Sequence, residues 1–155
     1  MTWSRRDWLR AAALGATGVF VTRRVFGEPV GSVIAITVYK TPTCGCCKEW
    51  VAHLTKNGFA LTVHDLPDLT QTKLSLGVPQ ALESCHTAVV GRYVVEGHVP
   101  AEVIRKLVSD SPNSIAGLAV PGMVQGSPGM EGGRKEPYDV VAFTREGKTS
   151  VYARR

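Results

Sequence analysis

Apolar and polar positions along residues 32–110 alternate with the periods of strands and helices in turn. Two runs rich in β-branched and apolar residues are typical of buried strands, SVIAITVY at 32–39 and FALTVHDL at 59–66. Between them, apolar residues recur at i, i+3, i+4 and i+7 over 46–57, and Gly58 follows. This spacing predicts an amphipathic helix that ends at the glycine.

The next stretch predicts a short helix, a hairpin and a further helix. A short helix over 69–76 is closed by a glycine. HTAVVG and RYVVEG, at 86–97, are typical of a hairpin with Gly91 near its turn. Pro100 then opens a helix over 100–110 that has an apolar face.

The predicted order is β-α-β-α-β-β-α. A βαβ unit followed by a helix, a hairpin and a covering helix is the thioredoxin-like arrangement. The sequence therefore predicts an α/β fold, with a central mixed sheet flanked by helices. Fold alone does not assign function.

The amino-acid composition of the chain changes after residue 110. The segment 111–137 is rich in glycine and proline and holds two Pro-Gly-Met repeats, at 121–123 and 128–130. A loop of this length in a compact domain is typically functional or disordered. The end, 138–155, predicts a closing β-hairpin.

The N-terminus predicts export. Arg5 and Arg6 precede an uncharged run at 11–21 that is too short to span a bilayer, and the pattern resembles a twin-arginine signal. We expect 1–27 to be the signal and 28–155 to be a periplasmic domain with no stable membrane span. An ordinary amphipathic helix and an uncleaved anchor are the alternatives.

Charge narrows the choice of partners. The chain carries 18 basic and 13 acidic residues, a net charge of +5. Five arginines and one aspartate fall within 1–27, which leaves 13 basic and 12 acidic residues beyond it, a net charge of +1. Because no basic stripe with interleaved aromatics remains, we expect no nucleic-acid partner.

Three cysteines occupy four positions directly after the first predicted strand. Cys44, Cys46 and Cys47 stand at a helix N-terminus, where the dipole and free amides stabilise thiolates. Cys44 and Cys47 share a helix face and could form a redox pair, with Cys44 attacking and Cys47 resolving. Cys46 is surplus to that motif, which favours a metal site.

Soft thiolate and thioether ligands select Cu(I), although zinc would also suit four thiolates. The loop before the third strand of a thioredoxin-like fold passes the cysteine motif, so we expect Cys85 there. His98 ends the next strand, and Glu96 is expected to orient its ring. The candidate ligands are Cys44, Cys46, Cys47, Cys85, His86, His98, Met123 and Met130.

Simpler roles remain open for these residues. Four cysteines allow three pairings, of which Cys44–Cys47, or one motif cysteine with Cys85, fits a structural disulfide. His86 could be a locally bonded strand residue. The two methionines could be apolar plugs on the core.

Three stretches, TPTCGCCKEWVAHL, GVP…SCHTAVVGRYVVEGHVP and GLAVPGMVQGSPGME, carry a family resemblance over about residues 34–143. The chain resembles periplasmic predicted metal-binding proteins of formerly unknown function, whose best-described members are CopG-type copper-resistance proteins. The resemblance implies a thioredoxin-like fold, a Cu(I) site around the Cys-Gly-Cys-Cys cluster and a role in copper detoxification.

Together these features favour a periplasmic Cu(I)-binding protein of copper resistance, with copper redox activity as an extension. Copper ions and other periplasmic copper-handling proteins are the expected partners. A thiol–disulfide oxidoreductase using Cys44 and Cys47 is the alternative, although Thr43 stands where thioredoxins carry an aromatic residue. A third alternative is an interaction module with passive disulfides.

Overall fold

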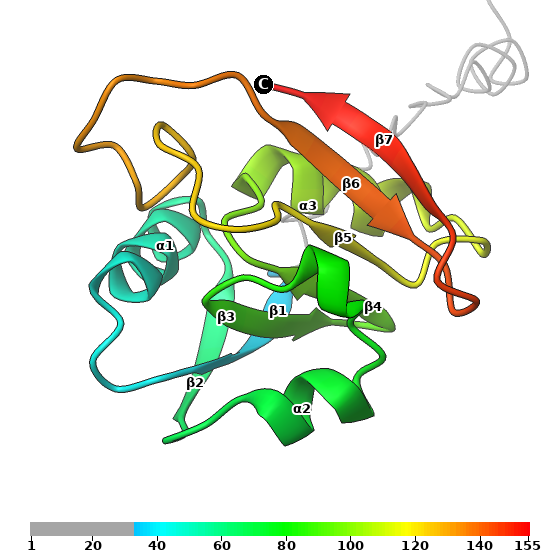
Figure 1. The fold of residues 1–155 in the computed structure, drawn as a ribbon, viewed down its shortest axis with the longest axis horizontal. Coiled ribbons are helices and arrows are strands. Elements are labelled where there is room, and N and C mark those ends of the chain that lie inside the picture. Colours follow the sequence, from blue (N-terminus) through cyan, green and yellow to red (C-terminus); the bar gives the residue numbers. More distant parts are fainter. Residues whose placement is uncertain (1–32) are drawn as a thin grey trace, which may run out of the picture. The chain divides into compact units, whose positions relative to one another are not determined.

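Seven strands form one mixed sheet in the computed structural model, which describes residues 33–155 (Figure 1). The predicted signal, 1–27, lies outside the described residues. The spatial order of the strands is β2-β1-β3-β4-β5-β6-β7. Their bounds are β1 (Ala35–Lys40), β2 (Ala60–Asp65), β3 (His86–Val90), β4 (Tyr93–Glu96), β5 (Gly117–Ala119), β6 (Asp139–Phe143) and β7 (Thr149–Arg154).

Helices pack on both sides of this sheet. On one side, α1 (Gly45–Lys56) and α3 (Ala101–Asp110) bury their apolar faces, which include Trp50 and Ile104, in the larger core. On the other, the chain that follows α2 (Thr70–Ser75), with a 3₁₀ turn (Gln80–Leu82), packs Val78 and Leu82 into a smaller core with Phe143. Strand residues alternate between the two cores, as the period of two requires.

The first seven predicted elements are confirmed, with bounds that differ by at most three residues. β1 pairs with β2 in parallel and with β3 antiparallel, and β3 pairs with β4 antiparallel. This order and pairing are compatible with the predicted thioredoxin-like arrangement. The C-terminal hairpin is also present, as β6 and β7.

One strand, β5, lies where the sequence predicts only loop. It pairs in parallel with β4 and antiparallel with β6, so it joins the C-terminal hairpin to the main sheet. Three residues are too few to show a period. The glycine at its start has a packing reason, because a Cβ at Gly117 would collide with the Val94 carbonyl and the Phe143 ring.

The helices of the described part are short. The longest, α1, has 12 residues. Within residues 33–155, no helix has the length and apolar character needed to cross a membrane.

Candidate metal centre

The cysteine cluster begins the first helix. Cys44 is the N-cap of α1, and its Sγ accepts the Cys47 backbone N–H at 3.3 Å. Cys47 lies on the apolar face of α1 and is fully buried, whereas Cys44 and Cys46 are half-buried. The first turn of the helix therefore directs three sulfurs to one end of the sheet, as the sequence predicts.

Two of these sulfurs are joined. Cys44 and Cys47 form a disulfide with their Cα atoms 5.3 Å apart, within the usual range for such a bridge. This is one of the pairings that the sequence left open. Cys46 and Cys85 are free thiols.

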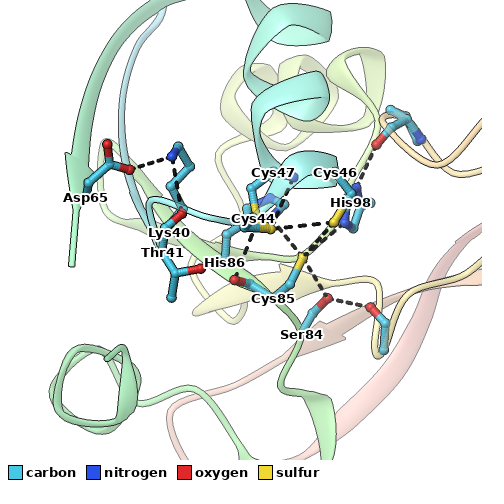
Figure 2. Close-up of a disulfide and its surroundings, with 12 residues drawn as sticks. Lys40, Thr41, Cys44, Cys46, Cys47, Asp65, Ser84, Cys85, His86 and His98 are labelled. Carbon is cyan, nitrogen blue, oxygen red and sulfur yellow. Dashed lines mark hydrogen bonds and ion pairs between the residues drawn. A yellow bond between two sulfur atoms is a disulfide. The ribbon is translucent and has the colours of Figure 1, made fainter. Parts of the chain in front are cut away.

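Cys85 completes a group of four sulfurs (Figure 2). Its Sγ lies 3.8 Å from Cys46 Sγ, which lies 3.5 Å from Cys44 Sγ. The register explains this approach, because Lys40, the last residue of β1, pairs with His86, the first of β3. The loop after β1 and the residue before β3 therefore meet at the same end of the sheet.

Two imidazoles reach the same sulfur from the other side. His98 Nε2 lies 3.1 Å and His86 Nδ1 3.3 Å from Cys85 Sγ. Both histidines are fully buried, and the His86 ring stands between Trp50 and His98, at centroid distances of 4.3 and 4.9 Å. His86 Nε2 has no hydrogen-bond partner. Cys85 thus belongs both to the four-sulfur group and to a Cys-His-His group.

A backbone carbonyl fixes the tautomer of His98. Its Nδ1 lies 2.7 Å from the Pro128 carbonyl oxygen, which can only accept, so Nδ1 carries the proton. In the neutral ring, Nε2 therefore presents its lone pair to Cys85. The expectation that Glu96 orients this ring is wrong, because its carboxylate binds Lys73, Thr87 and the backbone N–H of Ser84.

Burial sets the protonation of these groups. Desolvation lowers the pKa of His86 well below its ordinary value and also lowers the pKa of His98. Burial, with the neighbouring Cys46, raises the pKa of Cys85 to about 12. At neutral pH both imidazoles are therefore neutral, and the Cys85 thiol can donate to His98 Nε2.

The two Pro-Gly-Met repeats bracket the site. In the first, the Gly122 carbonyl accepts a hydrogen bond from Ser84, the neighbour of Cys85. In the second, the Pro128 carbonyl binds His98, and Gly129 lies so close to α1 that a Cβ there would come within 2.7 Å of the Cys46 carbonyl oxygen. Figure 1 shows this loop, in yellow to orange, passing α1.

The structure thus brings six of the eight candidate ligands together: Cys44, Cys46, Cys47, Cys85, His86 and His98. Met123 is 60% exposed and Met130 is half-buried, and ligation by either stays a prediction. Sequence reasoning missed Ser84 and the Pro128 carbonyl. The repeated Pro-Gly turn was the signal available for the carbonyl.

The donor set fits a soft metal ion. Thiolate sulfurs and neutral imidazole nitrogens are the protein ligands that bind Cu(I) and zinc. His98 already turns the unprotonated Nε2 toward Cys85, and His86 Nδ1 lies 3.3 Å from the same sulfur. With the disulfide closed, two thiols remain as ligands, so the full donor set requires reduction of the Cys44–Cys47 bond.

Comparisons with known proteins identify a family and two solved structures that are similar to this chain. A family described as a protein of unknown function, DUF411, matches residues 82–130, the segment that holds Cys85, both histidines and both repeats. A search of curated proteins found no match.

Two solved structures of the copper resistance protein CopG, its form 2 and form 1, are 48% identical to the chain. Each comparison covers 79% of this chain and 98% of the other, with TM-scores of 0.75 and 0.74. Because this identity extends over nearly the whole of a CopG chain, the chain belongs to the CopG family.

Proposed function

We propose that the chain binds Cu(I) as its cargo and acts in copper resistance or homeostasis. The observation that carries this proposal is the convergence of four sulfurs and two neutral imidazoles at one end of the sheet. Membership of a family whose solved members are named copper resistance proteins supports copper as the ion.

Each residue has a role in this proposal. Cys46 supplies one thiolate, and Cys44 and Cys47 supply two more once their disulfide is reduced. Cys85 bridges these sulfurs to the imidazoles of His86, through Nδ1, and His98. His98 offers Nε2, with the Pro128 carbonyl holding its proton on Nδ1. We propose Met123 and Met130 as weaker thioether ligands on the bracketing loop. Zinc suits the thiolates as well, so a test must compare the two ions.

The test is a Cu(I) titration of the reduced protein without oxygen, against a competing chelator. We expect tight binding by wild type and its loss in Cys44→Ser/Cys47→Ser. His64→Gln is the control, because this exposed histidine stacks on Tyr39 and lies outside both ligand groups. Equal Cu(I) binding by the cysteine variant, or tighter zinc than Cu(I) binding by wild type, would contradict the proposal.

A second function, thiol–disulfide exchange, is favoured by one observation. The Cys44–Cys47 disulfide sits at the N-terminus of α1, where a thiolate is stabilised. A redox enzyme would have a potential in the range of about −120 to −270 mV and would turn over disulfide substrates with Cys46→Ser unimpaired. Loss of turnover in that variant would argue against a simple dithiol enzyme.

We further propose that the protein acts in the periplasm, exported through its twin-arginine-like signal, beside other copper-handling proteins. Copper redox activity belongs to this proposal, because oxidation of the Cys44 and Cys47 thiols to their disulfide releases two protons and two electrons, which would reduce two Cu(II) ions to Cu(I). The check is to isolate the protein from the periplasmic fraction, identify its N-terminal residue and count its free thiols. Protein found only in the cytoplasm, with residues 1–27 retained, would refute it.

A further inference from the structure

A buried ion pair contacts the residues that flank Cys85 and His86 in the candidate metal centre. The side chains of Lys73 and Glu96 are 7% and 0% exposed, and their charged atoms are in contact. Lys73 lies on α2 and Glu96 ends β4. Neither residue is a candidate ligand, so the pair itself supplies no donor atom to the proposed site.

The carboxylate of Glu96 holds both flanks of the Cys85–His86 dipeptide. Glu96 Oε1 accepts the backbone N–H of Ser84 at 2.6 Å. Glu96 Oε2 accepts the hydroxyl of Thr87, also at 2.6 Å. One side chain therefore fixes the residue before Cys85 and the residue after His86.

The same residue links this dipeptide to the third member of the Cys-His-His group. Glu96 stands two positions before His98, and the intervening Gly97 donates its backbone N–H to the His86 carbonyl at 3.0 Å. A Cβ at Gly97 would come within 2.6 Å of Ser84 Oγ. The start of β3 and the end of β4 are thus held together around a single carboxylate.

Lys73 completes the arrangement from α2. Its ammonium contacts Glu96 and donates to Thr87 Oγ1 at 3.0 Å. Burying two charges is costly, and apolar residues of similar volume often stabilise a fold as well as a buried pair does. Stability alone therefore gives little reason for a charged pair here, whereas its hydrogen bonds hold the Cys85–His86 segment in one position.

We infer that Lys73 and Glu96 form a positioning unit that sets Cys85 and His86 against His98 for metal binding. The inference rests on the proposed function for the identity of the cargo. The geometric part, that the pair orders the Cys85 segment, can be tested without copper.

The main variant is Lys73→Met/Glu96→Leu, which keeps the volume buried and leaves no unpaired charge. We expect it to fold with a lower melting temperature than wild type, because the buried Thr87 hydroxyl loses both partners. We expect it to bind Cu(I) about 10- to 100-fold more weakly, as loss of support for metal ligands typically does. The matched control is Lys106→Met/Asp110→Leu, which removes an exposed i,i+4 pair on α3 and should bind like wild type.

A second readout needs no metal. With the Cys44–Cys47 disulfide intact, Cys46 and Cys85 are the free thiols, and mass spectrometry resolves their alkylation. We expect alkylation of Cys85 to accelerate at least several-fold relative to Cys46 in the main variant. If that variant does not fold, Thr87→Val, which removes one of the hydrogen bonds to Glu96 with little change in shape, should show the same effect more weakly.

The outcomes separate the two proposals. A folded variant with wild-type Cu(I) affinity and wild-type Cys85 alkylation overturns the positioning role. Weak Cu(I) binding by wild type itself refutes the proposed function. In that case the alkylation rates alone decide whether the pair orders the segment, faster alkylation of Cys85 supporting the inference and unchanged alkylation overturning it.

Discussion

At the scale of single residues, the proposed site depends on the protonation of three side chains, Cys85, His86 and His98. His98 holds its proton on Nδ1 because the Pro128 carbonyl accepts it. Burial keeps both imidazoles neutral and raises the pKa of Cys85 to about 12. The imidazoles are therefore ready to bind a metal ion, whereas Cys85 must first lose a proton.

This proton gives Cu(I) binding a pH dependence. Because the pKa of Cys85 is raised, the free protein keeps the proton throughout the neutral range, and ligation releases it. A higher pH therefore favours the binding of Cu(I). We expect the Cu(I) affinity of the reduced protein to rise by up to about 10-fold per pH unit for this proton between pH 6 and 8.

The measurement is the competition titration repeated at several pH values, with Cys85→Ser as the comparison. The variant should bind more weakly and show a shallower slope. An identical slope in the two proteins would mean that Cys85 releases no proton on binding.

At the scale of elements, the site is made by the ends of β1, β3 and β4, the first turn of α1 and the loop that brackets them. The sequence predicts the strands and the helix, because their periods are clear. It does not predict the contact of Pro128 with His98 or of Gly129 with α1, because a Gly-Pro-rich loop has no period that places it. β5 was missed for the same reason.

A substitution at Gly129 tests the bracketing loop. Gly129 has a φ of +86°, and a Cβ would meet the Cys46 carbonyl oxygen at 2.7 Å and the Trp50 backbone nitrogen at 2.8 Å. We expect Gly129→Ala to cost about 1–3 kcal/mol and to lift the loop from α1. Chemical denaturation measures the cost, and faster tryptic cleavage at Arg134 or Lys135 reports the lifted loop.

Gly132→Ala is the control for this substitution. Gly132 belongs to the same loop, and a Cβ there would meet no atom within 4 Å. Its stability and cleavage rate should match those of wild type. Equal behaviour of the two variants would show that the close approach of Gly129 does not hold the loop.

At the scale of the whole molecule, the sequence predicts the α/β class and the cysteine cluster, and the structure and the CopG comparison agree. The four-sulfur group could be anticipated from the topology, since the loop before β3 must pass the start of α1. The Lys73–Glu96 pair could not, because its partners are 23 residues apart and neither lies in a recognisable motif. The same limit explains why the sequence wrongly predicts that Glu96 orients the ring of His98.

We propose above all that copper is held by the sulfurs of this one site. X-ray absorption at the copper edge, on reduced protein loaded with one equivalent of Cu(I), measures the ligand atoms directly. We predict a first shell dominated by sulfur that gains nitrogen or oxygen in Cys46→Ser and Cys85→Ser. A shell of nitrogen and oxygen in wild type, unchanged in both variants, would contradict this proposal.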